Sequence, residues 1–224
     1  MKPHFTPVAD SAVLVTFGKA LGEDVFQSIV AFDKALQQSP PSGMVEAVPA
    51  LVNVLGIFDP VQTDHVELQV ALEKLLSGMS RNVLQTQNRV VQVCYDGPYA
   101  PDLKAVAQAC GLSEEAVIAA HLSGDYKVLM YGFAPGYAYM GGVSPDIQVP
   151  RKTAPVRDIP AGSVMIAGAQ CLVTTVKMPT GWSIIGRSPT PILLDDPARP
   201  FLFDIGDTVT FERISVDDLL KAMG

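Results

Sequence analysis

The chain has 224 residues, of which 48% are hydrophobic and 17% charged, and it carries a net charge of −7 at pH 7 with a pI near 4.9. This length allows one large or two small domains with a sizeable core, and the hydrophobic content excludes an intrinsically disordered chain. The net negative charge disfavours nucleic acid and anionic lipid as partners.

Two uncharged runs, residues 128–145 and 159–176, are long enough to suggest membrane spans by hydropathy. Their prolines, glycines and polar residues are incompatible with a membrane span, because the backbone could not form all of its hydrogen bonds within the segment in lipid. The N-terminus also lacks the basic and apolar blocks of a secretion signal. We therefore expect a cytoplasmic protein without a membrane partner. Cys94, Cys110 and Cys171 lack C-x-x-C spacing, so neither a disulfide framework nor a metal site is predicted.

The first 80 or so residues alternate strand-like and helix-like patterns. A strand is predicted over residues 11–17, and a helix over 21–36 ends at the Pro and Gly residues of the segment 39–43. Two strands follow over 45–48 and 51–58, and then a helix that begins at Thr63 or Asp64 and ends at Gly78. This β-α-β-β-α order predicts a ferredoxin-like α+β domain, with helices on one face of an antiparallel sheet.

Residues 80–88 are polar and rich in amides, which predicts a linker between a domain over 1–79 and a second domain over 89–224. The second domain is expected to begin with a strand over 89–95 and two short helices over 102–110 and 114–122. Between residues 126 and 214, short apolar runs are separated by Gly and Pro, a pattern typical of a β-sandwich or barrel. A helical turn is expected over 217–223.

Motifs of phosphate loops, dinucleotide-binding folds, zincins and serine hydrolases are absent from the sequence. The histidine of most interest is His121, at the end of the predicted helix 114–122. Two interpretations stay open for it: a cation that interacts with the helix dipole, and a general base in a cleft.

The acidic chain contains one cationic segment, residues 128–194. It holds five basic and two acidic residues, a charge of +3, so the rest of the chain sums to −10. Guanidinium groups on a rigid, partly dry barrel suit a carboxylate or phosphate ligand, although arginines scattered for solubility would give the same count. The basic residues are Arg151, Lys152, Arg157, Lys177 and Arg187.

Residues 132–142 alternate turn-forming residues with aromatics, including Phe133, Tyr137 and Tyr139. Such a loop can line a ligand pocket or complete a core, and composition does not separate the two. Gln170 lies within a long uncharged run, where its amide requires partners if buried; a structural contact and a ligand contact would satisfy it equally.

The second half of the chain also contains an ordered set of short motifs. They are Gly-Phe-Ala-Pro-Gly-Tyr at 132–137, Pro-Arg at 150–151, Ile-Pro-Ala-Gly-Ser-Val at 159–164, Gly-Trp at 181–182 and Ile-Gly-Arg at 185–187. With Pro-Asp-Leu at 101–103 and landmarks in the first half, these motifs resemble the family of 5-oxoprolinase B subunits, also known as allophanate hydrolase subunit 1 or the sporulation-kinase inhibitor family. The resemblance covers nearly the whole chain.

The resemblance implies an α+β N-terminal domain followed by a cyclophilin-like β-barrel. It also implies a heteromeric ATP-dependent amidohydrolase, in which an allophanate-hydrolase-subunit-2-type (C-type) subunit and an A-type 5-oxoprolinase subunit act with this chain. The reaction would convert 5-oxoproline, ATP and water to glutamate, ADP and phosphate. Because no nucleotide motif is present here, ATP is expected to bind in the assembled complex.

Site residues are carried over from the matching motifs. The resemblance implies that Arg151 and Arg187 hold the substrate carboxylate or a phosphorylated intermediate and that Gln170 orients the amide. Phe133, Tyr137 and Trp182 would exclude water, and His121 would carry a proton. Arg157 is not carried over, because relatives usually have basic residues on both of its sides, where this chain has Val156 and Asp158.

Two other functions stay open. The chain could inhibit a histidine kinase by binding its helical dimerisation domain, which would require exposed apolar anchors near Phe133 and Tyr137. It could also be a carboxyltransferase-type component of a urea carboxylase or allophanate hydrolase system, which would require a separate biotinylated partner.

Overall fold

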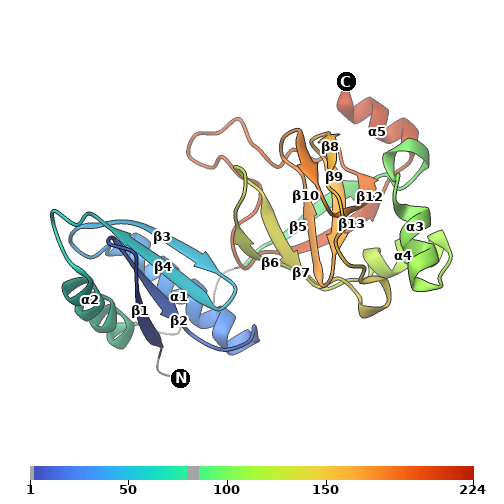
Figure 1. Ribbon diagram of the computed structural model, residues 1–224. Coiled ribbons are helices and arrows are strands. Elements are labelled where there is room, and N and C mark those ends of the chain that lie inside the picture. The colour runs from blue at the N-terminus through green and yellow to red at the C-terminus, as the bar shows by residue number, and fades with distance from the viewer. Residues whose placement is uncertain (1–2, 80–85) are drawn as a thin grey trace. The chain divides into compact units, whose positions relative to one another are not determined.

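The computed structural model describes residues 3–79 and 86–224 (Figure 1). The chain divides into two compact units, Met1–Gln85 and Thr86–Gly224, and each is described by itself. Of the predicted linker, residues 80–85 lie outside the described residues, and Asn88 begins a strand. The linker therefore stays a prediction.

The first unit is a four-stranded antiparallel sheet with two helices, and the strand order is β1-β2-β4-β3. The predicted β-α-β-β-α order is present, preceded by a strand that the sequence analysis missed. This strand, β1, contains Pro7, and it lies at the edge of the sheet, where a residue without an N–H is tolerated. The ferredoxin-like assignment stays a prediction. The elements are β1 (His4–Val8), β2 (Ala12–Thr16), α1 (Glu23–Gln38), β3 (Met44–Ala50), β4 (Asn53–Phe58) and α2 (His65–Gly78).

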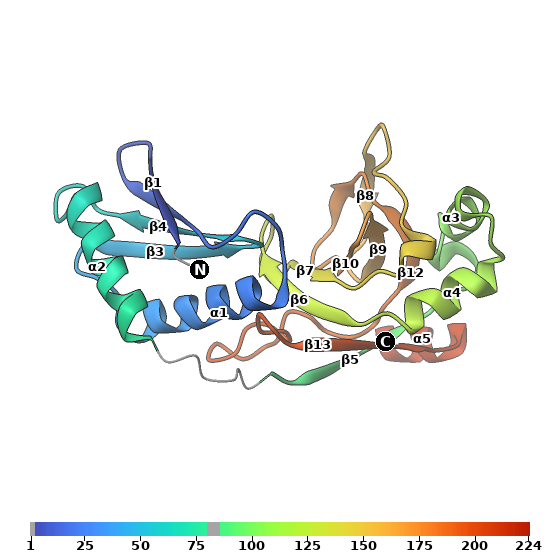
Figure 2. The ribbon, with the colours of Figure 1, turned by 90° about the horizontal axis from the view of Figure 1, so that it is seen from below.

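Both helices of the first unit lie on the same side of its sheet (Figure 2). Alternate residues of β2 and β4, such as Val13, Val15 and Val54, join the core, together with Phe32 of α1 and Leu72 of α2. The unit therefore has one hydrophobic core between its sheet and its two helices.

The second unit is mainly β, with a nearly closed, barrel-like sheet in the order β12-β9-β10-β7-β6-β13-β5. Its two edge strands meet where Cys94, directly after β5, exchanges two 2.8 Å main-chain hydrogen bonds with Arg187 at the end of β12. The cyclophilin-like assignment stays a prediction. The strands are β5 (Asn88–Val93), β6 (Tyr126–Tyr131), β7 (Ala138–Gly141), β9 (Ser163–Ala167), β10 (Gln170–Val173), β12 (Ser183–Arg187) and β13 (Thr208–Arg213).

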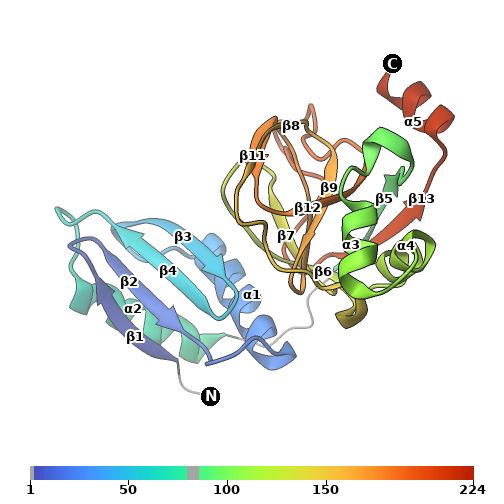
Figure 3. The same cartoon turned by 45° about the vertical axis from the view of Figure 1, so that its right-hand side comes forward.

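Helices α3 (Leu103–Cys110) and α4 (Glu114–Leu122) lie beside this sheet, and α3 is close to β12 (Figure 3). Ser113 caps α4 by accepting a hydrogen bond from the main-chain N–H of Ala116. A last helix, α5 (Val216–Met223), corresponds to the predicted helical turn. In the described part of the chain, no helix has the length and apolar character needed to cross a membrane.

Part of the barrel-like sheet is buried on both faces. Val164 and Ile166 of β9 pack into the interior core, whereas Met165 and Ala167 of the same strand pack into a second cluster. That cluster also contains residues of a two-stranded ribbon formed by β8 (Val156–Ile159) and β11 (Met178–Thr180). Burial on two faces explains the uncharged run at residues 159–176, because a strand that is covered on both sides has no solvent-facing positions for charged residues.

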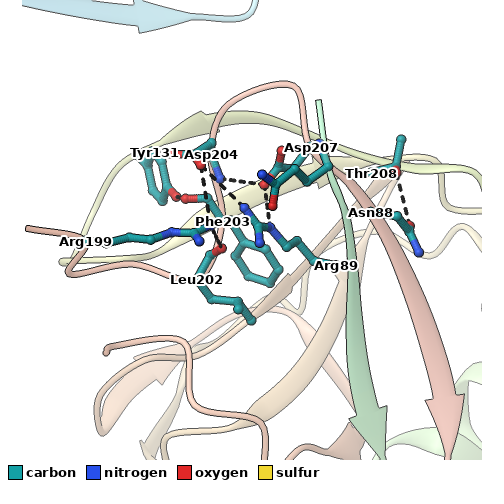
Figure 4. A network of polar contacts seen from close by, with 10 residues as sticks. Asn88, Arg89, Tyr131, Arg199, Leu202, Phe203, Asp204, Asp207 and Thr208 are labelled. Atoms are coloured by element: carbon teal, nitrogen blue, oxygen red, sulfur yellow. Dashed lines mark hydrogen bonds and ion pairs between the residues drawn. The ribbon is translucent and has the colours of Figure 1, made fainter. Parts of the chain in front are cut away.

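A polar network ties the loop before β13 to the start of β5 (Figure 4). The Nε of Arg89 donates to Asp207 at 2.7 Å, and the second carboxylate oxygen of Asp207 accepts from the main-chain N–H of Gln87 at 2.9 Å. The side chains of Arg89 and Asp207 are only 12% and 3% exposed. Tyr131 donates its hydroxyl to the carbonyl of Phe203 in the same network. The network therefore compensates a buried carboxylate at this end of the sheet.

Candidate functional site

Aromatic rings from separate segments meet at the second cluster of the barrel-like unit. The ring centroids of Phe133 and Tyr137 are 5.4 Å apart, those of Tyr137 and Tyr139 are 5.3 Å apart, and those of Tyr139 and Trp182 are 5.9 Å apart. Tyr139 belongs to β7, and Trp182 directly precedes β12. The structure thus brings together the three predicted wall residues Phe133, Tyr137 and Trp182, with Tyr139 between them.

The exposed end of this aromatic row is Phe133. Its side chain is 72% exposed, and its φ of +71° lies in a region that bulky residues rarely adopt. Hydrogen bonds hold the loop, among them one from the main-chain N–H of Gly132 to the carbonyl of Tyr137 and one from the hydroxyl of Thr175 to the carbonyl of Pro135. Strained backbone and an exposed ring together mark a contact surface.

Arg151 lies at the other end of the row. Its guanidinium carbon is 5.4 Å from the centroid of the Trp182 ring, which is a cation–π distance. Burial raises the pKa of Tyr137, and the positive charge of Arg151 acts in the opposite direction. The aromatic row therefore ends in an exposed cation supported by a buried indole.

Gln170 begins β10 and is half-buried. Because side chains alternate along a strand, Gln170 faces the same side of the sheet as Leu172, which packs in the cluster with Tyr137 and Trp182. The structure therefore places Gln170 on the sheet face that carries the aromatic row.

Arg187 ends β12 and is half-buried. Its Nε is buried without a hydrogen-bond partner, and burial lowers the pKa of its guanidinium. Arg151 lies over Trp182, which directly precedes the same strand, so its guanidinium group has different neighbours from that of Arg187.

The charges of the cationic segment divide into paired and unpaired groups. The Nζ of Lys152 is 2.6 Å from Asp102, and that of Lys177 is 2.8 Å from Asp158. Within residues 3–79 and 86–224, no carboxylate pairs with the segment's three arginines, which are Arg151, Arg157 and Arg187. The sequence analysis missed the Lys152–Asp102 pair, since its members are far apart in the chain and no local pattern joins them.

His121 lies in the interior core of the second unit. Its Nδ1 is 2.8 Å from the hydroxyl of Tyr95, and its Nε2 is 3.4 Å from the sulfur of Cys171. Burial lowers the pKa of His121 to about 3, so the ring is neutral at pH 7. The interpretation as a helix-terminal cation is therefore wrong, and the fully buried ring does not line an open cleft.

The residues described by the structure contain no group of three or more His, Cys, Asp or Glu side chains arranged to hold a metal ion. What they contain is an uncompensated cation on an aromatic row, a second half-buried guanidinium, and an amide on the row's sheet face. This combination suits recognition of a small anion that carries an amide.

The chain belongs to the family described as the carboxyltransferase domain, subdomain C and D, which matches residues 3–203. Within it, the chain is similar to proteins named as the B subunit of 5-oxoprolinase. The one from Bacillus subtilis (strain 168) is 35% identical over 223 residues, or 94% of this chain and 92% of that protein. The one from Haemophilus influenzae is 31% identical over 208 residues, or 93% of this chain and 96% of that protein.

Solved structures agree with this assignment. The crystal structure of TTHA0988 has a TM-score of 0.80 and 32% sequence identity over 92% of this chain, which spans only 40% of the TTHA0988 chain. PH0987 from Pyrococcus horikoshii has a TM-score of 0.57 and 33% identity over 96% of this chain and 100% of its own. The urea amidolyase of K. lactis has a TM-score of 0.81 at 16% identity over 98% of this chain and 15% of its own, which shows a shared fold.

Proposed function

We propose that this chain is the B-type component of a heteromeric, ATP-dependent 5-oxoprolinase and that its second unit binds the carboxylate of 5-oxoproline. The observation that carries the proposal is the 35% identity to the 5-oxoprolinase B subunit of Bacillus subtilis across 94% of this chain. The unpaired guanidinium groups of Arg151 and Arg187 support it, because a small carboxylate requires such charges.

The proposed assembly contains a C-type and an A-type subunit and works in the cytoplasm, with ATP bound in the assembled complex. For this chain, we propose a ferredoxin-like domain over residues 1–79, a linker over 80–88 and a cyclophilin-like barrel over 89–224. The antiparallel sheet with two helices on one side supports the first domain, and the nearly closed seven-stranded sheet supports the second.

The chemistry explains why ATP is needed. An unstrained amide is a poor electrophile, and transfer of the γ-phosphoryl group to the lactam oxygen turns that oxygen into a leaving group. Water then adds to the same carbon and the carbon–nitrogen bond of the ring breaks, which leaves γ-glutamyl phosphate with a free amino group. A second water releases phosphate from this acyl phosphate and gives glutamate, so the steps consume 5-oxoproline, ATP and two waters and yield glutamate, ADP and phosphate.

Each residue of the site has a defined part in this proposal. Arg187 and Arg151 hold the anionic groups of the substrate or the phosphorylated intermediate, and Gln170 orients the amide. The rings of Phe133, Tyr137 and Trp182 exclude water, which strengthens those electrostatic contacts. We give His121 no proton-transfer role, because its ring is fully buried against Tyr95 and Cys171.

The test is glutamate formation from 5-oxoproline and ATP by the chain mixed with its A-type and C-type partners. Arg187→Ala should lower kcat/KM about 30-fold, the effect of losing a charge-assisted hydrogen bond of about 2 kcal/mol. Arg157→Ala, an unpaired but exposed arginine of the same segment, should change it less than twofold. The proposal is wrong if no glutamate forms while the Bacillus subtilis relative is active with its own partners under the same conditions.

The exposure of Phe133 favours a second candidate, a protein-binding inhibitor of a histidine kinase. An amphipathic kinase helix would then dock on this ring, independently of partner subunits. Competition between this chain and a labelled helical dimerisation domain separates the two functions, and Phe133→Ala should abolish that competition. A role in biotin-dependent carboxyl transfer rests on the family description and on a fold shared at 16% identity, and would require a biotinylated partner.

A further inference from the structure

We propose that Asp102 is a positioning residue that holds the guanidinium group of Arg151 over the ring of Trp182. The inference concerns a residue whose motif, Pro-Asp-Leu at 101–103, has no role in the proposed reaction. Its consequence for catalysis rests on the proposed function, but the positioning itself does not. Contacts from two segments converge on one carboxylate oxygen of Asp102.

The Oδ2 atom of Asp102 accepts two hydrogen bonds from different segments. One comes from the Nζ of Lys152 at 2.6 Å, and the other comes from the main-chain N–H of Ile184 at 2.7 Å. The main-chain N–H of Asp102 also donates to the carbonyl of Ile184 at 3.0 Å. Asp102 therefore joins the residue next to Arg151 to the strand that directly follows Trp182.

Lys152 is held at its main chain as well as at its side chain. Its backbone N–H donates to the carbonyl of Gly181 at 2.7 Å. The backbone N–H of Trp182 in turn donates to the hydroxyl of Thr180 at 3.0 Å. The segments that carry Arg151 and Trp182 are thus connected twice, once through the main chain and once through Asp102.

The ion pair between Lys152 and Asp102 also leaves Arg151 available for a ligand. Lys152 neutralises the carboxylate of Asp102, and both side chains are largely shielded from water, at 25% and 20% exposed. Arg151 has no carboxylate partner in the described part of the chain, and its planar group lies against the indole. Because the carboxylate of Asp102 pairs with Lys152, the guanidinium group of Arg151 is left for an external anion.

The chain offers a direct probe, because Trp182 is its only tryptophan. Iodide is an anion and acrylamide is neutral, so the ratio of their quenching constants reports the positive charge beside the indole. Arg151→Ala should lower this ratio about twofold, and Asp102→Asn should lower it by the same factor, although the loss of a negative charge alone would raise it. The double variant should add nothing, because both changes remove the same interaction.

The matched control is the Lys177–Asp158 pair of the same unit, whose side chains are 66% and 76% exposed. Asp158→Asn should leave the quenching ratio unchanged. Thermal unfolding of each variant, followed by circular dichroism, separates a local change from loss of the fold. If Asp102→Asn does not fold, Lys152→Met decides the question when it is compared with the double variant of Lys152→Met and Arg151→Ala. A decrease caused by lost positioning disappears in the Arg151→Ala background, whereas a direct effect of the Lys152 charge persists there.

An unchanged quenching ratio in the folded Asp102→Asn or Lys152→Met variant overturns the proposal, as does an equal change in Asp158→Asn. In the assembled enzyme, Arg151→Ala should lower kcat/KM. Asp102→Asn should lower kcat/KM as well, and Asp102→Glu should retain part of the wild-type value. Failure of the wild-type assembly to form glutamate would remove the proposed function and leave the fluorescence result standing. The two failures are therefore distinguishable.

Discussion

Each unit buries a titratable side chain, which is an acid in the first unit and a base in the second. Asp33 of α1 is only 7% exposed, and burial raises the pKa of its carboxyl to about 6 although Gln37 donates a hydrogen bond to it. His121 of α4 is fully buried, and burial lowers its pKa to about 3. Burial disfavours the charged form in both cases, so in the acidic range the second unit should lose stability as pH falls, whereas the first unit should lose stability as pH rises.

The units also differ in how their sheets are covered. In the first unit, both helices lie on one side of the sheet, whereas β9 of the second unit is buried on both faces. Tyr137 and Trp182 pack in the cluster that contains Ile159 and Met178 of the β8–β11 ribbon. Packing on both faces of the sheet fixes side chains such as Trp182. The indole therefore gives the guanidinium group of Arg151 the rigid support that a binding residue requires.

The largest expected effect tests how the second unit tolerates an uncompensated buried charge. Arg89→Ala removes the partner of the buried Asp207 carboxylate and should lower the free energy of unfolding by about 3–5 kcal/mol. Arg199→Ala, whose exposed side chain lies 3.7 Å from the exposed Asp204, should cost about 0–1 kcal/mol. Urea unfolding followed by Trp182 fluorescence measures both values, and equal losses would contradict the burial argument.

A smaller effect concerns the stability of the second unit at acidic pH. Because the folded-state pKa of His121 is about 3 and the unfolded value is 6.5, the unfolded chain binds the proton first as pH falls. The second unit should therefore lose about 2 kcal/mol from this group between pH 7 and pH 5.

His121→Asn should reduce this pH dependence, whatever its effect on the free energy of unfolding at pH 7. The measurement is urea unfolding at pH 7, 6 and 5, again followed through Trp182. Identical pH slopes in the variant and the wild type would show that another group causes the acid sensitivity.

The last expected effect lies in the first unit and has the opposite sign. The pKa of Asp33 is about 6 when folded and 3.8 when unfolded, so its stabilising contribution is present at low pH and is lost as pH rises through 6. Asp33→Asn should therefore stabilise the first unit by about 2 kcal/mol more at pH 7.5 than at pH 4.

Hydrogen exchange of the α1 amides reports this change for the first unit alone. Asp10→Asn, an exposed residue of the same unit, serves as the control and should not alter the exchange. A stabilisation by Asp33→Asn that is as large at pH 4 as at pH 7.5 would exclude the titration of Asp33 as its cause.

The sequence by itself determined most of the secondary structure and the family. Helical spacing, capping residues and Gly/Pro punctuation act within a few residues, so α1, α2, α3 and α4 were predicted close to their observed positions. Strand β1 was missed because its pattern is interrupted by Pro7, which only its edge position accommodates. The aromatic loop at 132–137 and the arginines at 151 and 187 were also identified from motifs.

Only the tertiary structure decided which of these residues act together. It brought Arg151 to Trp182 and enclosed His121 between Tyr95 and Cys171. It also paired Lys152 with Asp102 across a long stretch of chain. The physical reason is that burial and ion pairing depend on the full three-dimensional surroundings of a side chain, whereas helices, turns and motifs are encoded by neighbours in sequence.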